Sequence, residues 1–170
     1  MNKQTSPTTT DDVTLMPNAA TADRTVIIDR GFAGPPSRVF AAWIDPALAV
    51  KWFGPEGFTT SEIVIEPHPG GRWANVMTAP DGTRYASTGE IRDIVPAKRL
   101  VIFDDGKAGP ERGHATKITV TFEPSGTGTA ITLVHGVFKT KAMRDECARG
   151  WTSTFDRLER LMRGDRIEPV

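Results

Sequence analysis

The sequence predicts an α+β domain in which a curved antiparallel sheet wraps around one long C-terminal helix. Two observations carry this prediction. Between residues 139 and 164, large apolar residues recur at intervals of three and four, which is typical of a helix with one buried face; they are Met143, Cys147, Trp151, Phe155, Leu158 and Met162. Before this stretch, short β-rich segments alternate with turn sequences, and hairpin connections make neighbouring strands antiparallel. A helix laid across the concave side of a curled sheet closes a core and often leaves a cavity.

The predicted C-terminal helix has one clear end and one irregular position. Gly164 follows the last apolar residue, where a C-cap glycine is expected. Gly150 lies in the middle of the pattern, where glycine costs about 1 kcal/mol relative to alanine. We therefore expect it to mark close packing against another backbone, or a local bend. The charged residues between the apolar ones, Arg157 among them, are expected mostly on the opposite face.

The rest of the chain is predicted to form one strand, two short helices and six further strands. The first strand covers residues 24–32, and Pro35 and Pro36 suit the start of a helix that ends before Pro46. Asp45 can cap a second helix at residues 47–52. Asp81-Gly82 is a strong hairpin signal, and residues 106–113 are expected to form a loop. The six later strands are expected at residues 63–65, 72–78, 84–94, 99–104, 116–122 and 130–137.

Length and composition fit a single domain of residues 24–164 between two tails. The chain has 170 residues with 21 basic and 21 acidic side chains, so its formal net charge of zero predicts neither a nucleic-acid nor a membrane partner. One cysteine excludes an internal disulfide and a multi-cysteine metal site, which fits a reducing cytoplasm. No apolar run approaches the roughly 20 residues of a membrane span. Residues 1–23 lack the apolar core of a secretory signal and are expected to be disordered, and residues 165–170 form the C-terminal tail.

Short motifs occur along the chain in a characteristic order. They are PPSRVFAAW at residues 35–43, KWFGP at 51–55, PGGRW at 69–73, IVPAKRL at 94–100 and a closing Gly150-Trp151. Together they resemble the family of activator of heat shock protein 90 ATPase homologue-like proteins in the START-like (SRPBCC) superfamily. The resemblance extends from about residue 24 to residue 164, and it implies the helix-grip fold with an apolar cavity between sheet and helix. It does not imply one activity, because members bind ligands, cyclise polyketides or assist a chaperone.

Aromatic residues supply most of the candidate ligand-binding positions. Taken singly, each of the four tryptophans is more typical of a core than of a ligand site. Taken together they indicate a pocket, because the architecture that the resemblance implies places cavity walls at these positions. The candidate ligand-binding residues are Trp43, Trp52, Phe53, Trp73, Met77, Phe103, His135, Trp151 and Phe155.

His135 is the main candidate for a polar group inside the pocket. It shares a strand face with Ile131 and Leu133 and is expected to point inward. A structural or anchoring role is favoured over general acid/base catalysis, because no triad partner can be identified from spacing. No catalytic residue and no metal ligand is assigned.

Three carboxylates within the predicted strands are interpreted as surface charges. Glu90 and Asp93 fall on opposite faces by strand parity, and Glu66 lies at the end of an earlier strand. Cross-strand pairs with Arg72, Arg84 or Arg92 are expected in preference to acid/base chemistry.

The sequence therefore predicts a non-enzymatic domain that binds a small hydrophobic or amphipathic molecule, with His135 and Arg72 orienting its polar end. One alternative is an enzyme, a cyclase or hydrolase, that uses the same cavity. Another is a chaperone cofactor acting through its outer surface. No cofactor is predicted; the expected partners are a small hydrophobic molecule or a chaperone, and the protein is expected to be a monomer or homodimer.

Overall fold

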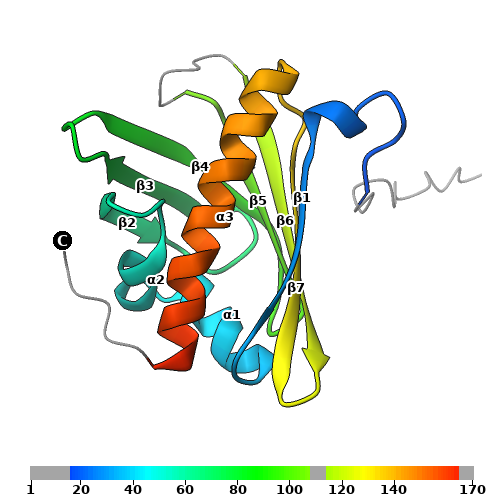
Figure 1. The fold of residues 1–170 in the computed structure, drawn as a ribbon, viewed down its shortest axis with the longest axis vertical. Helices are drawn as coiled ribbons and strands as arrows, with labels where there is room; N and C mark the ends of the chain where they lie inside the picture. Colours follow the sequence, from blue (N-terminus) through cyan, green and yellow to red (C-terminus); the bar gives the residue numbers. More distant parts are fainter. Residues whose placement is uncertain (1–15, 108–113, 165–170) are drawn as a thin grey trace, which may run out of the picture.

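The computed structural model describes residues 16–107 and 114–164 of the chain. The predicted fold class is confirmed, because a seven-stranded antiparallel sheet curls around a long C-terminal helix and two short helices follow the first strand (Figure 1). In chain order the elements are η1 (Ala22–Arg24), β1 (Val26–Phe32), α1 (Pro36–Ile44), α2 (Pro46–Trp52), β2 (Thr59–Ile65), β3 (Arg72–Thr78), β4 (Arg84–Val95), β5 (Arg99–Asp104), β6 (Thr116–Ser125), β7 (Gly128–Gly136) and α3 (Lys141–Arg163).

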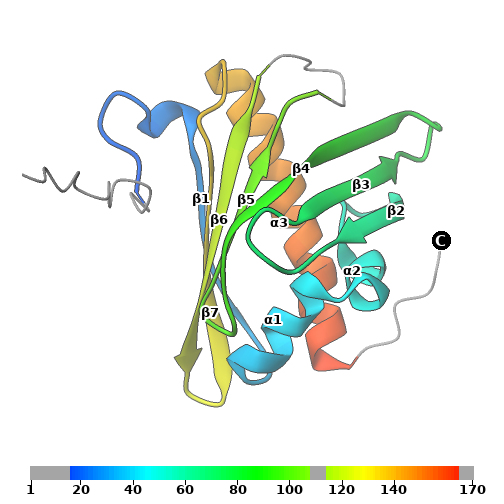
Figure 2. The ribbon, with the colours of Figure 1, turned by 180° about the vertical axis from the view of Figure 1, so that it is seen from behind.

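The sheet has the strand order β1-β7-β6-β5-β4-β3-β2. The first two strands along the chain therefore lie at opposite edges of the sheet, and α1 and α2 connect them across one end (Figure 2). At one edge β1 pairs with β7, so that Val26 lies opposite His135. This arrangement leaves the concave side of the sheet to α3, which crosses it diagonally (Figure 1).

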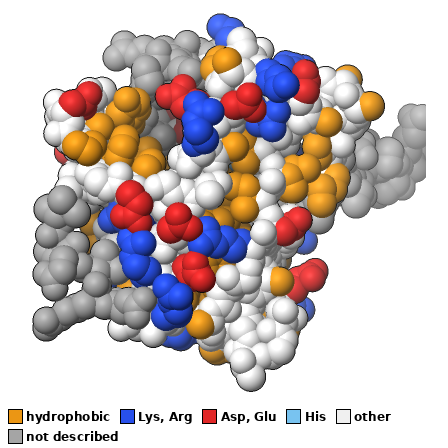
Figure 3. Space-filling view, in the orientation of Figure 1, with side chains coloured by type: hydrophobic (Ala, Val, Ile, Leu, Met, Phe, Trp, Pro, Cys, Tyr) orange, Lys and Arg blue, Asp and Glu red, His pale blue; other side chains and the backbone are white. Residues whose placement is uncertain are grey.

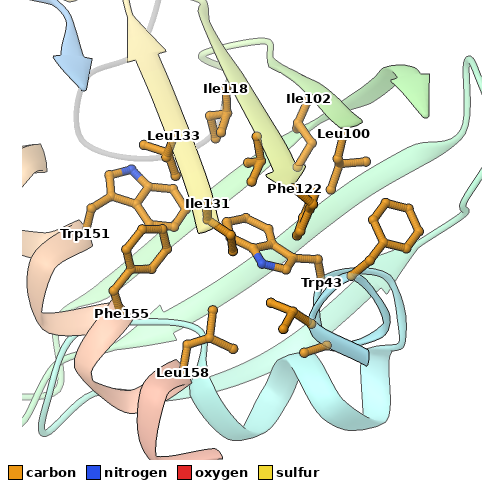
Figure 4. Packing of buried hydrophobic residues seen from close by; sticks show 14 of the residues in the cluster. Trp43, Leu100, Ile102, Ile118, Phe122, Ile131, Leu133, Trp151, Phe155 and Leu158 are labelled. Carbon is orange, nitrogen blue, oxygen red and sulfur yellow. The ribbon is translucent and has the colours of Figure 1, made fainter. Parts of the chain in front are cut away.

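The hydrophobic core lies between α3, α1 and the concave side of the sheet (Figure 4). Trp43 of α1 stacks on Trp151 of α3 with ring centroids 5.9 Å apart, and Phe155 packs edge-on against Trp43. Strand β7 contributes Ile131 and Leu133, which are almost completely buried. A side chain of this size stabilises the fold by about 1.5–3 kcal/mol when it is fully buried.

The helices begin and end at the residues that local chemistry favours. Asp45 terminates α1 and caps α2, because its carboxylate accepts a hydrogen bond of 2.9 Å from the Ala47 N–H. Thr140 caps α3 in the same way through the Met143 N–H. Gly164 ends α3 with a φ of 81°, in the left-handed region that favours glycine, so the predicted C-cap is confirmed.

Gly150 corrects one expectation about α3. A Cβ atom added at this position would meet nothing closer than Cγ of Pro55 at 3.8 Å, an ordinary van der Waals distance. Close packing against a backbone therefore does not explain this glycine, and its missing side chain leaves open space beside the helix.

Arg157 corrects a second expectation, because this arginine lies in the interior rather than on the outer face of α3. Its side chain is directed at the loop of residues 53–58, and only 8% of its surface is exposed. Most other charged residues of α3 fit the expected outer face, where basic and acidic side chains lie next to one another (Figure 3).

A β-bulge at Arg92 corrects the expected faces of the carboxylates on β4. Glu90 lies opposite Phe103 and Asp93 lies opposite Val101, so both carboxylates share one face of the sheet. Both carboxylates pair with arginines, but not in the predicted way. Glu90 pairs with Arg92 of its own strand, and Asp93 pairs across strands with Arg99 of β5 at 2.5 Å.

The predicted tails and one loop lie largely outside the described residues. Residues 1–15, 108–113 and 165–170 are not described. The predicted tail of residues 1–23 overlaps the start of η1, and η1 lies beside α3. Among the described residues, no helix is both long and apolar enough to cross a membrane.

Candidate functional site

A cleft of about 310 Å³ lies between the N-terminal half of α3 and the concave side of the sheet. One wall comes from α3 and a second from the loop of residues 53–58. The third comes from inward-facing residues of β3 to β7. Hydrophobic side chains gather on the surface near β3 and β4, on the face of the molecule that carries α3 (Figure 3).

Aromatic side chains form the deep part of the cleft. The ring of Phe53 lies edge-on against Trp73 and Trp151, with centroid distances of 6.0 Å and 5.8 Å. Met77 lies four residues after Trp73 on the same face of β3, and Phe58 packs near Tyr85 towards the outside. The structure therefore brings four of the candidate residues, Phe53, Trp73, Met77 and Trp151, together around a common space.

Arg157 holds the loop that supplies Phe53. Its Nη1 donates to the Gly54 carbonyl at 2.9 Å, and further carbonyls of the same segment lie within 3.3–3.4 Å of its guanidinium, those of Lys51, Phe53, Pro55 and Phe58. Burial lowers the pKa of this guanidinium. The loop is tied to α3 at two more points, where the Glu56 N–H donates to the Ser153 hydroxyl at 2.8 Å and the Glu56 carboxylate pairs with Arg160.

His135 lies in the cleft wall with 9% of its surface exposed, as its strand parity predicts. Its Nδ1 accepts a hydrogen bond of 3.0 Å from the Trp151 indole N–H, and the Cys147 sulfur lies 3.4 Å from the same nitrogen. Because Nδ1 accepts, the proton of the neutral ring lies on Nε2, which is 2.9 Å from the Thr116 hydroxyl. Burial lowers the pKa of His135 to about 3, so the ring is neutral at physiological pH.

Asp104 is the carboxylate that the strands bring into the cleft. It lies at the end of β5 on the same face as the buried Ile102, and its Oδ1 accepts from the Gly106 N–H at 2.9 Å. The Ser87 hydroxyl from β4 also bonds to it. Burial is the largest cause of a raised pKa for Asp104, because a half-buried carboxylate loses water that would stabilise its charge.

Four of the predicted ligand-binding residues lie elsewhere. Trp43, Trp52 and Phe155 belong to the hydrophobic core. They are at most 4% exposed and pack against other buried side chains. Trp43 Nε1 has no hydrogen-bond partner among the described residues, and this tryptophan borders a separate small cavity together with Asn75. Phe103 lies on the convex face, with the Arg92 guanidinium 4.4 Å from its ring centre. Phe103 is adjacent to Asp104 on β5, and successive side chains of a strand point to opposite faces, so Phe103 points away from the cleft.

Arg72, expected to help orient a ligand, is also on the outer face. It is exposed, one residue before the buried Trp73 on β3, and strand alternation directs it away from the cleft. Its backbone N–H donates to the Glu66 carboxylate at 2.7 Å.

The residues of the cleft that sequence reasoning missed are mostly small or polar. They include Ser87, Asp104, Gly150 and Thr154, together with the aromatic Tyr85. Tyr85 lies directly opposite Met77 across the β3–β4 pair, so a known hairpin register would have found it. The two missed residues of α3 could have been found from the apolar stripe that contains Cys147 and Trp151. Gly150 and Thr154 occupy neighbouring positions on the same helix face.

Comparison with known proteins places this fold among several bacterial structures. The chain is similar to a crystal structure from Chromobacterium violaceum with a TM-score of 0.74 and 25% identity, covering 82% of this chain and 96% of that one. A crystal structure from Silicibacter pomeroyi gives a TM-score of 0.72 with 25% identity over 82% and 97% of the two chains. One from Rhodobacter sphaeroides gives 0.70 with 26% identity over 84% and 94%.

No curated protein matches the chain. The sequence model of the family described as Activator of Hsp90 ATPase homolog 1-like protein matches residues 33–163. That range begins just after β1 and continues to the last residue of α3, so it includes every residue that lines the cleft. Because one match accounts for nearly the whole domain, the chain belongs to the Activator of Hsp90 ATPase homolog 1-like protein family.

Proposed function

We propose that the domain binds a small, largely apolar molecule in the cleft between α3 and the sheet. The observation that supports this proposal most is the arrangement of Phe53, Trp73 and Trp151 around a space of about 310 Å³. Small-molecule sites are commonly concave, mostly apolar, and equipped with a few polar groups. The cleft has this composition, with the buried His135 and the half-buried Asp104 among its polar members.

The volume of the cleft sets the size of the proposed ligand. At about 30 Å³ for each water-sized group, 310 Å³ holds roughly ten non-hydrogen atoms. Each buried methylene group contributes about 0.8 kcal/mol, which is about a fourfold gain in affinity. The affinity for straight-chain ligands should therefore rise with chain length and then level off when the cleft is full.

Binding is favoured over catalysis by the surroundings of His135. Its Nδ1 already accepts from Trp151 and its Nε2 is paired with Thr116, so neither nitrogen is available to take a proton from a substrate. Its low pKa would also make it a weak base.

Titration with neutral alcohols from hexanol to undecanol tests the proposal, with calorimetry and tryptophan fluorescence as readouts. We expect saturable binding that strengthens about fourfold for each added carbon and levels off near ten non-hydrogen atoms. Absence of saturable binding, or a gain that continues unchanged through undecanol, would contradict the proposal. A chaperone cofactor that acts through its outer surface, the alternative that the family's description suggests, predicts no such saturation.

Gly150→Leu provides a variant that fills the cleft. The glycine lies in the cleft wall with space beside it, so the four carbon atoms of a leucine side chain should occupy room that a ligand would otherwise use. We expect the chain length at which affinity levels off to shorten by about three or four carbon atoms, because each methylene excluded forfeits its contribution. Arg149→Leu is the matched control, since Arg149 is exposed on the same turn and lines no part of the cleft. Equal behaviour of the two variants would place the ligand outside the cleft.

A further inference from the structure

The charged groups of the cleft all have the same sign. Asp104 lies in its wall and Glu146 at its exposed rim, whereas no lysine or arginine lines the cleft in the part of the chain that the structure describes. The nearby Lys107 is exposed, with its ammonium group 3.7 Å from the Asp105 carboxylate. The whole chain has a formal net charge of zero, so this local excess of acidic groups is a property of the cleft and not of the protein in general.

His135 cannot compensate for a negative ligand. Its ring is neutral because burial lowers its pKa to about 3. Its only N–H is directed at Thr116, and its other nitrogen accepts from Trp151. A carboxylate or phosphate in the cleft would therefore meet no lysine or arginine side chain in the cleft wall among the described residues, and it would lie near Asp104.

Asp104 has capacity for at least one more hydrogen-bond donor. Its carboxylate receives the Gly106 N–H and the Ser87 hydroxyl, while a carboxylate can accept about four hydrogen bonds. Half-burial without a cation makes its charge costly, which is the largest cause of its raised pKa. A positively charged donor placed beside it would offset this cost, and such charge-assisted hydrogen bonds are the stronger kind.

We propose that the cleft selects amphiphiles with a protonated amine at the polar end, with the amine donating to Asp104 and the apolar body packed between Trp73 and Trp151. Anionic amphiphiles such as fatty acids are disfavoured at the same site. This inference rests on the proposed function, because it names the class of molecule that the same cleft takes.

Three probes of matched size separate these possibilities: phenylbutylamine, phenylbutanol and phenylbutyrate, titrated by calorimetry at neutral pH. We expect the amine to bind at least about tenfold more tightly than the carboxylate, with the alcohol between them. Asp104→Asn should weaken the amine about tenfold and leave the alcohol within about threefold of its wild-type affinity, because the amide retains the shape but not the charge. Asp105→Asn is the matched control, since it removes the same charge from the adjacent position, which does not line the cleft.

Equal or tighter binding of the carboxylate would overturn the inference, as would an amine affinity that Asp104→Asn and Asp105→Asn change to the same extent. In both cases saturable binding of the alcohol would leave the proposed function intact. If none of the three probes binds saturably, both the inference and the proposed function are overturned.

Discussion

Replacing Arg157 by methionine should loosen the loop that forms one wall of the cleft. Methionine keeps most of the unbranched apolar stem but removes the guanidinium, which lies among the carbonyl oxygens of residues 51–58. Those carbonyls belong to the backbone segment that places Phe53 and Pro55 in the cleft wall. The substitution therefore tests whether a buried charge on α3 holds this wall of the cleft in place.

The magnitude follows from the number of hydrogens available. Nη1 carries two hydrogens and approaches four carbonyls, and Nη2 approaches one more, so about three hydrogen bonds form at one time. Hydrogen bonds to charged groups contribute about 1.5–3 kcal/mol each. The cost of burying the guanidinium, visible in its lowered pKa, offsets part of this sum. We expect a net loss of about 2–4 kcal/mol, a large share of a total stability that is usually about 5–15 kcal/mol.

Urea denaturation measures the loss, and amide hydrogen exchange locates it. Protection should fall mainly in residues 53–58, because these residues lose their attachment to α3 first. Arg149→Met makes the same substitution at an exposed position of the same helix, and should change stability by less than about 0.5 kcal/mol. A loss below about 1 kcal/mol in Arg157→Met, or an exchange pattern like that of the control, would refute the role assigned to this arginine.

Two further predictions concern the residues that join α3 to the sheet. Trp151→Ala should lower the free energy of unfolding by about 3–5 kcal/mol, because the ring is 7% exposed and stacks on Trp43; a loss below about 1 kcal/mol in chemical denaturation would contradict its place in the core. His135 should make the fold sensitive to acid, since its folded pKa of about 3 lies below the ordinary histidine value of 6.5, so that protons bind the unfolded chain first as the pH falls through that window. The wild type should lose about 2 kcal/mol more than His135→Gln between about pH 7.5 and pH 5, measured by urea denaturation at both values, and equal losses would show that the ring is not buried as a neutral group.

The parts of the fold that local chemistry determines were predictable from the sequence. The stripe from Met143 to Met162, the cap at Asp45 and the terminal Gly164 each depend on residues a few positions apart, and each is confirmed. The pairing of β1 with β7 was not predicted, because it joins residues about a hundred positions apart and leaves no local pattern. That pairing decides which strands form the edges of the sheet.

The face of each strand was the harder question, because one extra residue reverses every side chain after it. Arg92 is such a residue on β4, and it places Glu90 and Asp93 on one face instead of two. The β3–β4 turn poses the same difficulty. A two-residue turn at Asp81-Gly82 would pair Met77 with Ala86, but the loop has three residues and pairs Met77 with Tyr85. The length of the turn therefore decides that Tyr85 faces the cleft, and the hydrophobic alternation of the strand alone does not predict it.

Side-chain size along α3 explains where the cleft lies. Towards the C-terminus the inward positions carry Phe155, Leu158 and Met162, which fill the space against the sheet and are at most 4% exposed. Towards the N-terminus the inward positions carry the small Cys147 and Gly150, and the cleft occupies the space beside them. Filling that space at Gly150 would favour the helix by about 1 kcal/mol, and the structure shows no steric obstacle to a Cβ there. A helix built for stability alone would therefore carry alanine at this position, and under the proposed function the glycine leaves room for a bound molecule.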